Sequence, residues 1–160
     1  MENKVSKSDP KTILPVLLSA LRAQHWMYYT LHWQASGENF YSNHLLFERL
    51  YNALPGQFDT LAEKIVAMCG SASVNAVDAL NKTSVWVKAW SAITNPIQMA
   101  LRSESEVQQL IKDVYDKLKA QKQLSCGMDD YLLALANEHE TNQYLLGQLA
   151  CTDVDDNDGE

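Results

Sequence analysis

The stretch that decides the fold runs from residue 32 to residue 63 and reads HWQASGENFYSNHLLFERLYNALPGQFDTLAE. It carries five potential metal ligands: His32, His44, Glu48, Asp59 and Glu63. His44 and Glu48 are four residues apart, as are Asp59 and Glu63, so on a helix each pair shares one face. Glu48 and Asp59 are eleven residues apart, close to three whole turns. The spacing therefore predicts a helix whose two ligand pairs point the same way.

One copy of this helix cannot close a metal site, because eleven residues at 1.5 Å each separate the two pairs by roughly 16 Å. All five side chains can serve one centre only if a second copy runs antiparallel across a two-fold axis. His44 and Glu48 of each copy would then face Asp59 and Glu63 of the other, and the dimer would contain two identical sites. The spacing thus predicts a metal site built between subunits.

The same stretch resembles the signature of the Dps mini-ferritins, in which H-W-x-x-x-G-x-x-F-x-x-x-H leads into a helix ending D-x-x-A-E-R. The matching residues are His32-Trp33, Gly37, Phe40, His44, Phe47, Asp59 and Ala62-Glu63-Lys64-Ile65. The resemblance implies that the family's two-fold ferroxidase ligands are His32, His44, Glu48, Asp59 and Glu63. It also implies a dodecameric cage, hydrogen peroxide as the preferred oxidant and a ferric mineral in the cavity.

Four residues depart from the family pattern. The family usually has Asp where this chain has Glu48, which lengthens that ligand by one methylene. It usually has Arg at the position of Lys64, and it has no counterpart of Pro55-Gly56. A proline inside a helix loses a backbone hydrogen bond and clashes with the preceding turn, so we expect a kink near residues 51–56 rather than two separate helices.

The composition favours one helix-rich globular domain of 160 residues, with only four prolines and six glycines. The formal net charge of −7 and the pI near 5.0 do not favour nucleic-acid binding over the whole surface. Neither a signal peptide nor a membrane-spanning run is evident, so we expect a cytoplasmic protein. Three widely spaced cysteines (Cys69, Cys126 and Cys151) favour reduced thiols over disulfides.

Helical periodicity and turn residues predict an all-α chain with four long helices and a short helix between the second and third of them. The resemblance to the Dps family implies that these helices form a ferritin-like four-helix bundle. The expected helices cover residues 12–35, 43–69, 77–90, 97–123 and 129–149, with Ser42 or Asn43 capping the second and Gly70 ending it. Residues 1–11 are expected to be a flexible tail, 12–150 the bundle and 151–160 an acidic disordered tail. The first tail has three lysines against two carboxylates, which favours a solvated tail over a DNA-binding arm.

Several side chains outside the motif have expected roles. A mostly apolar stripe at helical spacing on the first helix consists of Leu14, Leu17, Leu18, Leu21, Tyr28, Leu31 and Ala35. His25 is expected to be a packing histidine, and Trp33 to form the wall of the site or to pack in a core or interface. Trp86 and Trp90 are expected at a subunit interface, and the charges on 97–123 on a solvated or cage-lining face. His139 is expected at the surface or in an inter-helix bond, and Asp129 and Asp130 to complement the helix dipole or line a pore.

Two imidazoles and three carboxylates suit Fe(II), and carboxylates stabilise Fe(III) once it forms. Conventional ferritin-like sites inside one bundle use Glu-x-x-His, and no acidic residue stands three before any of the four histidines. We therefore expect a ferroxidase, an oxidoreductase acting on metal ions, with Fe(II) and hydrogen peroxide or oxygen as substrates. The alternatives are a DNA-compacting protein, and a structural helical oligomer whose site holds zinc or stays empty.

Overall fold

The computed structural model describes residues 10–155 and, for side-chain surroundings, residues 12–150. The long helices are α1 (Pro10–Gln34), α2 (Phe40–Cys69), α4 (Pro96–Ala120) and α5 (Cys126–Asp155). The connection between α2 and α4 contains a 3-10 turn, η1 (Ser71–Ser73), and the shorter helix α3 (Ala76–Trp90). The all-α fold with a helical crossover is confirmed. The predicted tails fall mostly outside the described residues, although α5 continues to Asp155, into the segment expected to be disordered.

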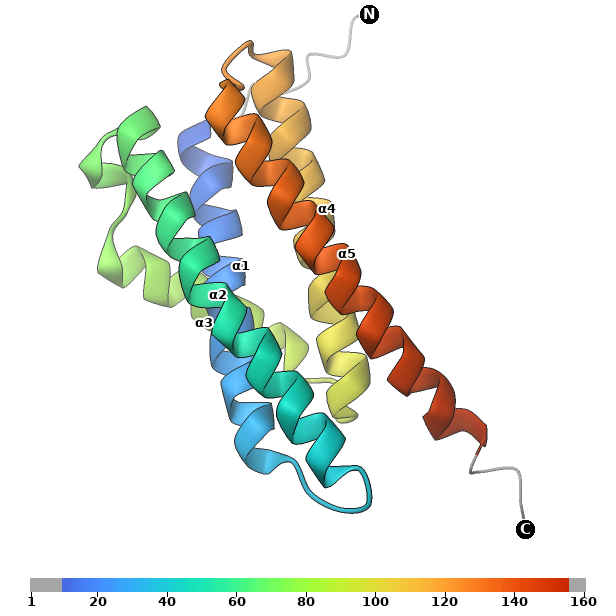
Figure 1. The fold of residues 1–160 in the computed structure, drawn as a ribbon. Helices are drawn as coiled ribbons and strands as arrows, with labels where there is room; N and C mark the ends of the chain where they lie inside the picture. Colours follow the sequence, from blue (N-terminus) through green and yellow to red (C-terminus); the bar gives the residue numbers. More distant parts are fainter. Residues whose placement is uncertain (1–9, 156–160) are drawn as a thin grey trace, which may run out of the picture.

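The four long helices form two antiparallel pairs (Figure 1). α1 lies against α2, and α4 lies against α5, while α1 also packs on α4 and on the crossover helix α3. α2 and α5 touch only sparsely, although they complete the ring of four helices. α1 is therefore the central element of the fold.

The predicted stripe on α1 forms the middle of the core. Leu14, Leu17, Leu18, Leu21, Tyr28 and Leu31 are all buried. Ala35 lies beyond the end of α1 and is only half-buried. The apolar periodicity of the sequence thus located the core face of this helix correctly up to its last turn.

Polar residues at the helix ends satisfy backbone groups that lack partners inside the helix. The side chain of Asn75 accepts hydrogen bonds from the backbone of Val77 and Asp78 at the start of α3, and Asn95 does the same for α4. Gly70 ends α2, as predicted, with a φ of 86° that favours glycine. These caps explain why both ends of the crossover could be predicted from the sequence.

The predicted start of α2 at Ser42 or Asn43 is wrong, because the helix begins at Phe40. The backbone N–H of Phe40 donates to the carbonyl of Gly37, and that of Asn43 donates to the carbonyl of Asn39. The turn after Gly37 therefore winds directly into the helix without a side-chain cap. Downstream, α2 continues through Pro55 as one helix.

Trp90 is not an interface residue, contrary to the prediction. Its side chain is buried inside this chain, and its indole N–H donates to a Glu106 carboxylate oxygen at 2.7 Å. Trp86 stacks on it with ring centroids 5.3 Å apart. The pair attaches the end of the crossover helix to α4, which is an intrachain role.

No helix within the described part of the chain is long and apolar enough to cross a membrane.

Candidate metal centre

His32 and His44 meet where the end of α1 faces the start of α2. Their rings stack with centroids 3.7 Å apart and planes 26° apart. The Nδ1 atom of His32 lies 3.0 Å from the backbone carbonyl oxygen of His44, and Nδ1 of His44 lies 3.0 Å from the carbonyl oxygen of His32. The two histidines are thus locked together by a reciprocal pair of hydrogen bonds.

This pairing fixes which nitrogen of each ring is free. A carbonyl oxygen only accepts hydrogen bonds, so both Nδ1 atoms must donate, and in the neutral imidazole Nε2 keeps its lone pair. Metal-binding histidines commonly have this arrangement, in which one ring nitrogen donates to a carbonyl and the other binds the metal. The donor set therefore fits a metal ion on this structural ground, with both Nε2 atoms as candidate ligands.

Aromatic side chains surround the two imidazoles. The ring of Tyr51 meets His32 edge-on at 5.2 Å, Tyr29 stacks beside His32 at 6.4 Å, and Phe40 lies 5.1 Å from His44. Trp33 packs on Tyr29 at 4.3 Å but is 60% exposed, so it is not a core residue of this chain. Tyr29 and Tyr51 are not among the residues predicted for this site. Tyr29 stands three residues before His32, a spacing that places both on one face of α1.

Glu48 lies one turn after His44 on α2 and is half-buried. Burial of the ring, followed by the charges of Glu48 and Tyr29, raises the pKa of Tyr51. Because Tyr51 contacts His32, this electrostatic effect links Glu48 to the same corner of the bundle. Glu48 thus lies near this corner, but within residues 12–150 it does not close a three-ligand group with the two histidines.

Asp59 and Glu63 lie farther along the same helix, and both are exposed. Eleven residues of a single helix separate Asp59 from Glu48, a rise of roughly 16 Å. Within residues 12–150 no three His, Cys, Asp or Glu side chains converge closely enough to hold a metal ion. One chain therefore brings together His32 and His44 but leaves Asp59 and Glu63 apart from them.

His25, two turns before His32, packs among aromatic rings. It stacks on Tyr29 at 6.0 Å and meets Phe58 and Tyr51 edge-on at 5.7 and 6.3 Å. Burial, with the nearby Arg22 as the second cause, lowers the pKa of this imidazole. These contacts fit the packing role expected for it.

A second polar cluster lies in the middle of the bundle, where charged side chains were expected to be solvated. Glu104 of α4 is fully buried, so the prediction that this face lies in solvent is wrong at Glu104. Its carboxylate accepts from the Tyr28 hydroxyl at 2.6 Å and lies 2.5 Å from Nδ1 of His139. His139 therefore makes the inter-helix bond that was one of its two expected roles, and the surface alternative is wrong.

The cluster joins three helices, since Tyr28 belongs to α1, Glu104 to α4 and His139 to α5. Ser103 lies 2.9 Å from the Tyr28 hydroxyl and extends the network. Burial, followed by the charge of Glu104, raises the pKa of Tyr28 well above its usual value, so this phenol stays protonated and continues to donate. Tyr28 belongs to the predicted stripe and an inter-helix bond was one expected role of His139, but no sequence pattern marked Glu104 or Ser103 as buried.

Comparison with known proteins identifies the fold and the family. Residues 14–150 match the ferritin-like domain family. The chain belongs to this family. It is 31% identical over 83 residues to the "DNA protection during starvation protein" of Brevibacillus brevis, a match that covers 49% of this chain and little more than half, 56%, of that relative.

Solved structures of Dps proteins have the same fold as this chain. Dps from Thermosynechococcus elongatus superposes with a TM-score of 0.75 at 20% identity, covering 88% of this chain and 89% of that one. The Dps protein from Vibrio cholerae O1, described as a member of a superfamily of ferritin-like diiron-carboxylate proteins, gives 0.74 at 18% identity over 88% of each chain. The resemblance inferred from the 32–63 motif, and the ferritin-like bundle, are confirmed.

Proposed function

We propose that this protein is a mini-ferritin that oxidises Fe(II) at sites shared by two-fold-related subunits and stores the ferric product in a cage. The observation that carries the proposal is the reciprocal bonding of His32 and His44, which leaves both Nε2 atoms available to a metal ion. The ferritin-like family and the Dps fold support an iron-handling role. Such a protein would act as a ferroxidase and limit oxidative damage.

In the proposed site, His32, His44 and Glu48 come from one subunit, and Asp59 and Glu63 come from its partner. The separation of the two ligand groups along a single α2 helix supports this division. Imidazoles bind Fe(II), and carboxylates favour Fe(III), so a mixed set retains the ion through the change of oxidation state. Zinc suits the same ligands and could occupy the site without turning over.

The reaction requires only the ferrous substrate and an oxidant. Each Fe(II) gives up one electron, and one hydrogen peroxide molecule takes up two electrons and two protons as its O–O bond breaks to form water. This route consumes peroxide together with the iron that would otherwise reduce it to radicals. Oxygen is the second candidate oxidant.

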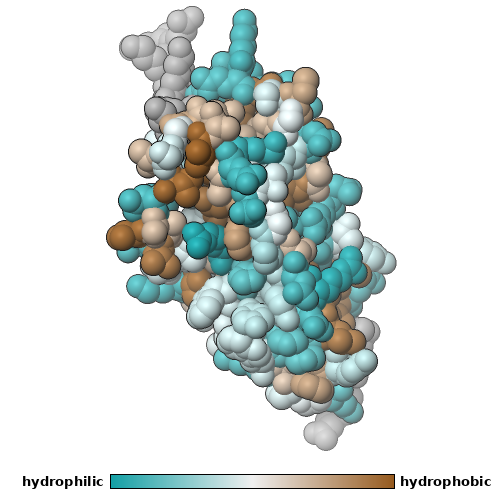
Figure 2. Space-filling view, turned by 60° about the vertical axis from the view of Figure 1, so that its left-hand side comes forward, coloured by the Kyte–Doolittle hydropathy of each residue, from teal (hydrophilic) through white to brown (hydrophobic). Residues whose placement is uncertain are grey.

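A closed assembly follows from the same proposal. Large apolar side chains are exposed on α1 and α3, among them Trp26, Val77, Leu80 and Val85. Figure 2, which brings the left-hand side of Figure 1 forward, shows apolar groups interrupting a largely hydrophilic surface. Exposed apolar groups of this kind suit subunit contacts. We propose two-fold dimers that assemble into a dodecamer in the cytoplasm.

DNA binding is the second candidate, because the Brevibacillus relative is named for DNA protection. The net charge of −7 argues against it, since association with phosphates requires a basic surface. A structural oligomer with a zinc-filled or empty site is the remaining alternative. Metal analysis of the purified protein and a salt-dependent DNA shift would reveal these two cases.

The test is Fe(II) oxidation by purified protein, loaded without oxygen and followed by absorbance after addition of peroxide or air. Asp59→Asn should slow oxidation while leaving the helical circular dichroism intact, because it removes a charged ligand from an exposed position. Asp116→Asn, an exposed change on α4, is the matched control and should oxidise iron at the wild-type rate. If Asp59→Asn and the wild type oxidise Fe(II) equally fast, the proposed site is wrong.

A further inference from the structure

A cavity lies between α2 and α5, where the two helices touch only sparsely. Its volume is about 290 Å³, and Ala53, Gly56 and Gln57 line it from α2. The α5 side is formed by Tyr131, Ala134, Leu135 and Glu138. The small residues Ala53, Gly56 and Ala134 leave room between the two helices, so the space is open. None of the lining residues belongs to the proposed iron site.

Gln57 points into this cavity with an unsatisfied amide. The residue is only 8% exposed, and neither its Nε2 nor its Oε1 has a hydrogen-bond partner among the described residues. A buried donor or acceptor without a partner destabilises the free protein. A ligand that forms hydrogen bonds with this amide would relieve that destabilisation, and this relief favours binding.

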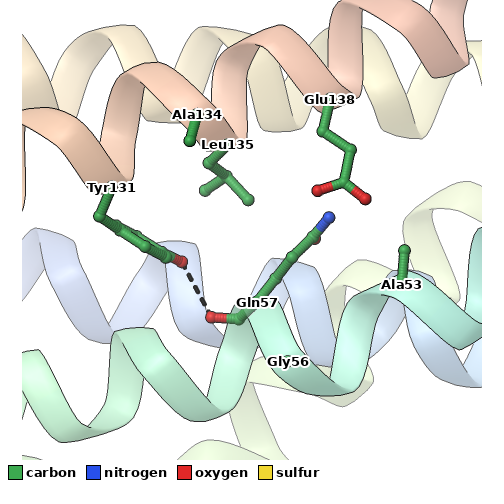
Figure 3. Close-up of a pocket in the computed structure, with 7 residues that line it drawn as sticks. All are labelled: Ala53, Gly56, Gln57, Tyr131, Ala134, Leu135 and Glu138. Carbon is green, nitrogen blue, oxygen red and sulfur yellow. Dashed lines mark hydrogen bonds between the residues drawn. The ribbon is translucent and has the colours of Figure 1, made fainter.

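Glu138, whose side chain is exposed to solvent, gives the mouth of the cavity a negative charge. Figure 3 shows the amide end of Gln57 reaching from α2 toward the Glu138 carboxylate on α5. No cation forms an ion pair with Glu138 in the part of the chain that the structure describes. The cavity therefore presents carboxylate and amide oxygens that can accept hydrogen bonds from a cation.

The opposite end of the cavity is closed by Tyr131. Its hydroxyl donates to the backbone carbonyl of Gln57 at 2.9 Å (Figure 3), and the Lys64 ammonium lies 5.7 Å from its ring. Burial, with Glu138 as the second cause, raises the pKa of Tyr131, so the phenol remains a donor. Because Lys64 repels positive charge at this end, a bound cation is directed toward Glu138.

We propose that this cavity binds a short aliphatic ammonium ion. The ammonium group would donate to the Glu138 carboxylate and to Gln57 Oε1, and its methylene groups would lie against Ala53, Ala134 and Leu135. A divalent metal ion fits less well, because it takes about six oxygen ligands and the cavity offers one carboxylate and one amide. This site is independent of the proposed iron chemistry.

The experiment is titration calorimetry of the assembled, metal-free protein with n-butylammonium, repeated with tetramethylammonium and with Mg²⁺. Wild-type protein should bind n-butylammonium and bind tetramethylammonium much more weakly, because the latter has no N–H donors. Glu138→Gln should weaken n-butylammonium binding roughly tenfold or more, since charge-assisted hydrogen bonds are the strong ones. Ala134→Leu should abolish it by filling the cavity while keeping every polar group.

Two control variants establish whether binding is specific to this cavity. Glu140→Gln removes a carboxylate that is exposed like Glu138 but lies on the opposite side of α5, and this change should leave binding unchanged. Asp59→Asn should also bind n-butylammonium normally, whether or not it oxidises iron. The proposal is wrong if the wild type does not bind n-butylammonium or if all variants bind it equally. It is also wrong if Mg²⁺ binds in a Glu138-dependent manner in place of the amine.

Discussion

At the scale of single residues, the two histidines of the candidate metal centre are held by backbone atoms rather than by other side chains. Each Nδ1 donates to the carbonyl of the other histidine, so the orientation of one ring depends on the position of the other helix end. A ligand fixed before the metal arrives loses little conformational freedom on binding. The two histidines are therefore preorganised for the proposed site.

His44→Ala removes one of the proposed direct ligands and should therefore weaken Fe(II) binding. Loss of an outer-shell partner alone typically costs roughly 10- to 100-fold in affinity, so we expect a loss of at least that size. The backbone carbonyl of residue 44 survives, so His32 keeps its own hydrogen bond and its orientation. Anaerobic calorimetry with Fe(II), and with Zn²⁺ as a second probe, measures the loss. His25→Ala is the matched control on α1 and should bind both ions like the wild type; an equal loss there would point to general disruption of the aromatic cluster.

The cluster of Tyr28, Glu104 and His139 is a buried polar contact inside an otherwise apolar bundle. Removing one partner of a buried charged pair costs roughly 3–5 kcal/mol, because the other partner is left uncompensated. Replacing both partners by apolar residues of similar size is often close to neutral. The cluster should therefore show strong coupling between its members.

We expect Glu104→Leu and His139→Leu each to lower the free energy of unfolding by about 3–5 kcal/mol. The double variant should lose much less than the sum of the two, since neither partner is then left alone and Tyr28 keeps Ser103 as a partner at 2.9 Å. Urea unfolding at one fixed protein concentration measures the three changes. Strictly additive losses would show that the pair does not act as a unit.

At the scale of the elements, Pro55 lowers the stability of α2. The ring removes the backbone N–H that would bond to the carbonyl of Tyr51, and Pro55 itself is exposed, so its replacement opens no cavity. Pro55→Ala should therefore raise the free energy of unfolding by as much as about 3 kcal/mol, which is measured as a higher melting temperature. Gly56→Ala is the matched control, because an added Cβ meets no atom within 4 Å, and it should gain only about 0.5–1 kcal/mol. A gain at Pro55 no larger than that at Gly56 would contradict the assigned hydrogen-bond cost.

The helices were predictable from the sequence because local signals mark them. Apolar residues at helical spacing located the buried face of α1, and Gly70, Asn75 and Asn95 mark the ends of the crossover. The predicted start of α2 is too late in the chain. Ser42 and Asn43 are good capping residues, but the helix is started instead by the backbone hydrogen bond from Phe40 to the carbonyl of Gly37. Residue propensities predict that a helix begins in this region, but the backbone geometry of the folded chain determines its first residue.

The polar interior was not predictable from one sequence. Glu104 and His139 are 35 residues apart and carry no motif, and an isolated glutamate on an amphipathic helix is ordinarily solvated. Gln57 lies inside the motif but was not recognised, because its environment depends on the spacing between α2 and α5. In contrast, His32 and His44 lie at adjacent helix ends. The connection between these helices is short, so a contact of this kind can be expected from the sequence.

At the scale of the whole molecule, the position of the ligands along α2 makes the subunit an incomplete unit for the proposed chemistry. One chain holds His32 and His44 at one corner and exposes Asp59 and Glu63 elsewhere. In a two-fold dimer each site would use the histidines of one subunit and the distal carboxylates of the other. Activity then depends on which variants share a dimer, a property that no site within a single chain would have.

Two inactive variants should therefore restore each other's activity. His32→Ala/His44→Ala and Asp59→Asn/Glu63→Gln should each oxidise Fe(II) poorly alone, because every site lacks ligands. Co-expressed in equal amounts, they form heterodimers in which one site receives both sets of mutations and the other receives none. Random pairing makes half the dimers mixed, each with one intact site of two, so the rate should reach about a quarter of the wild-type rate. Mixing the separately purified assemblies without exchange of subunits is the control and should give no recovery. If the co-expressed protein contains mixed dimers by mass spectrometry but shows no recovery, the histidines and carboxylates do not form one site across the two-fold axis.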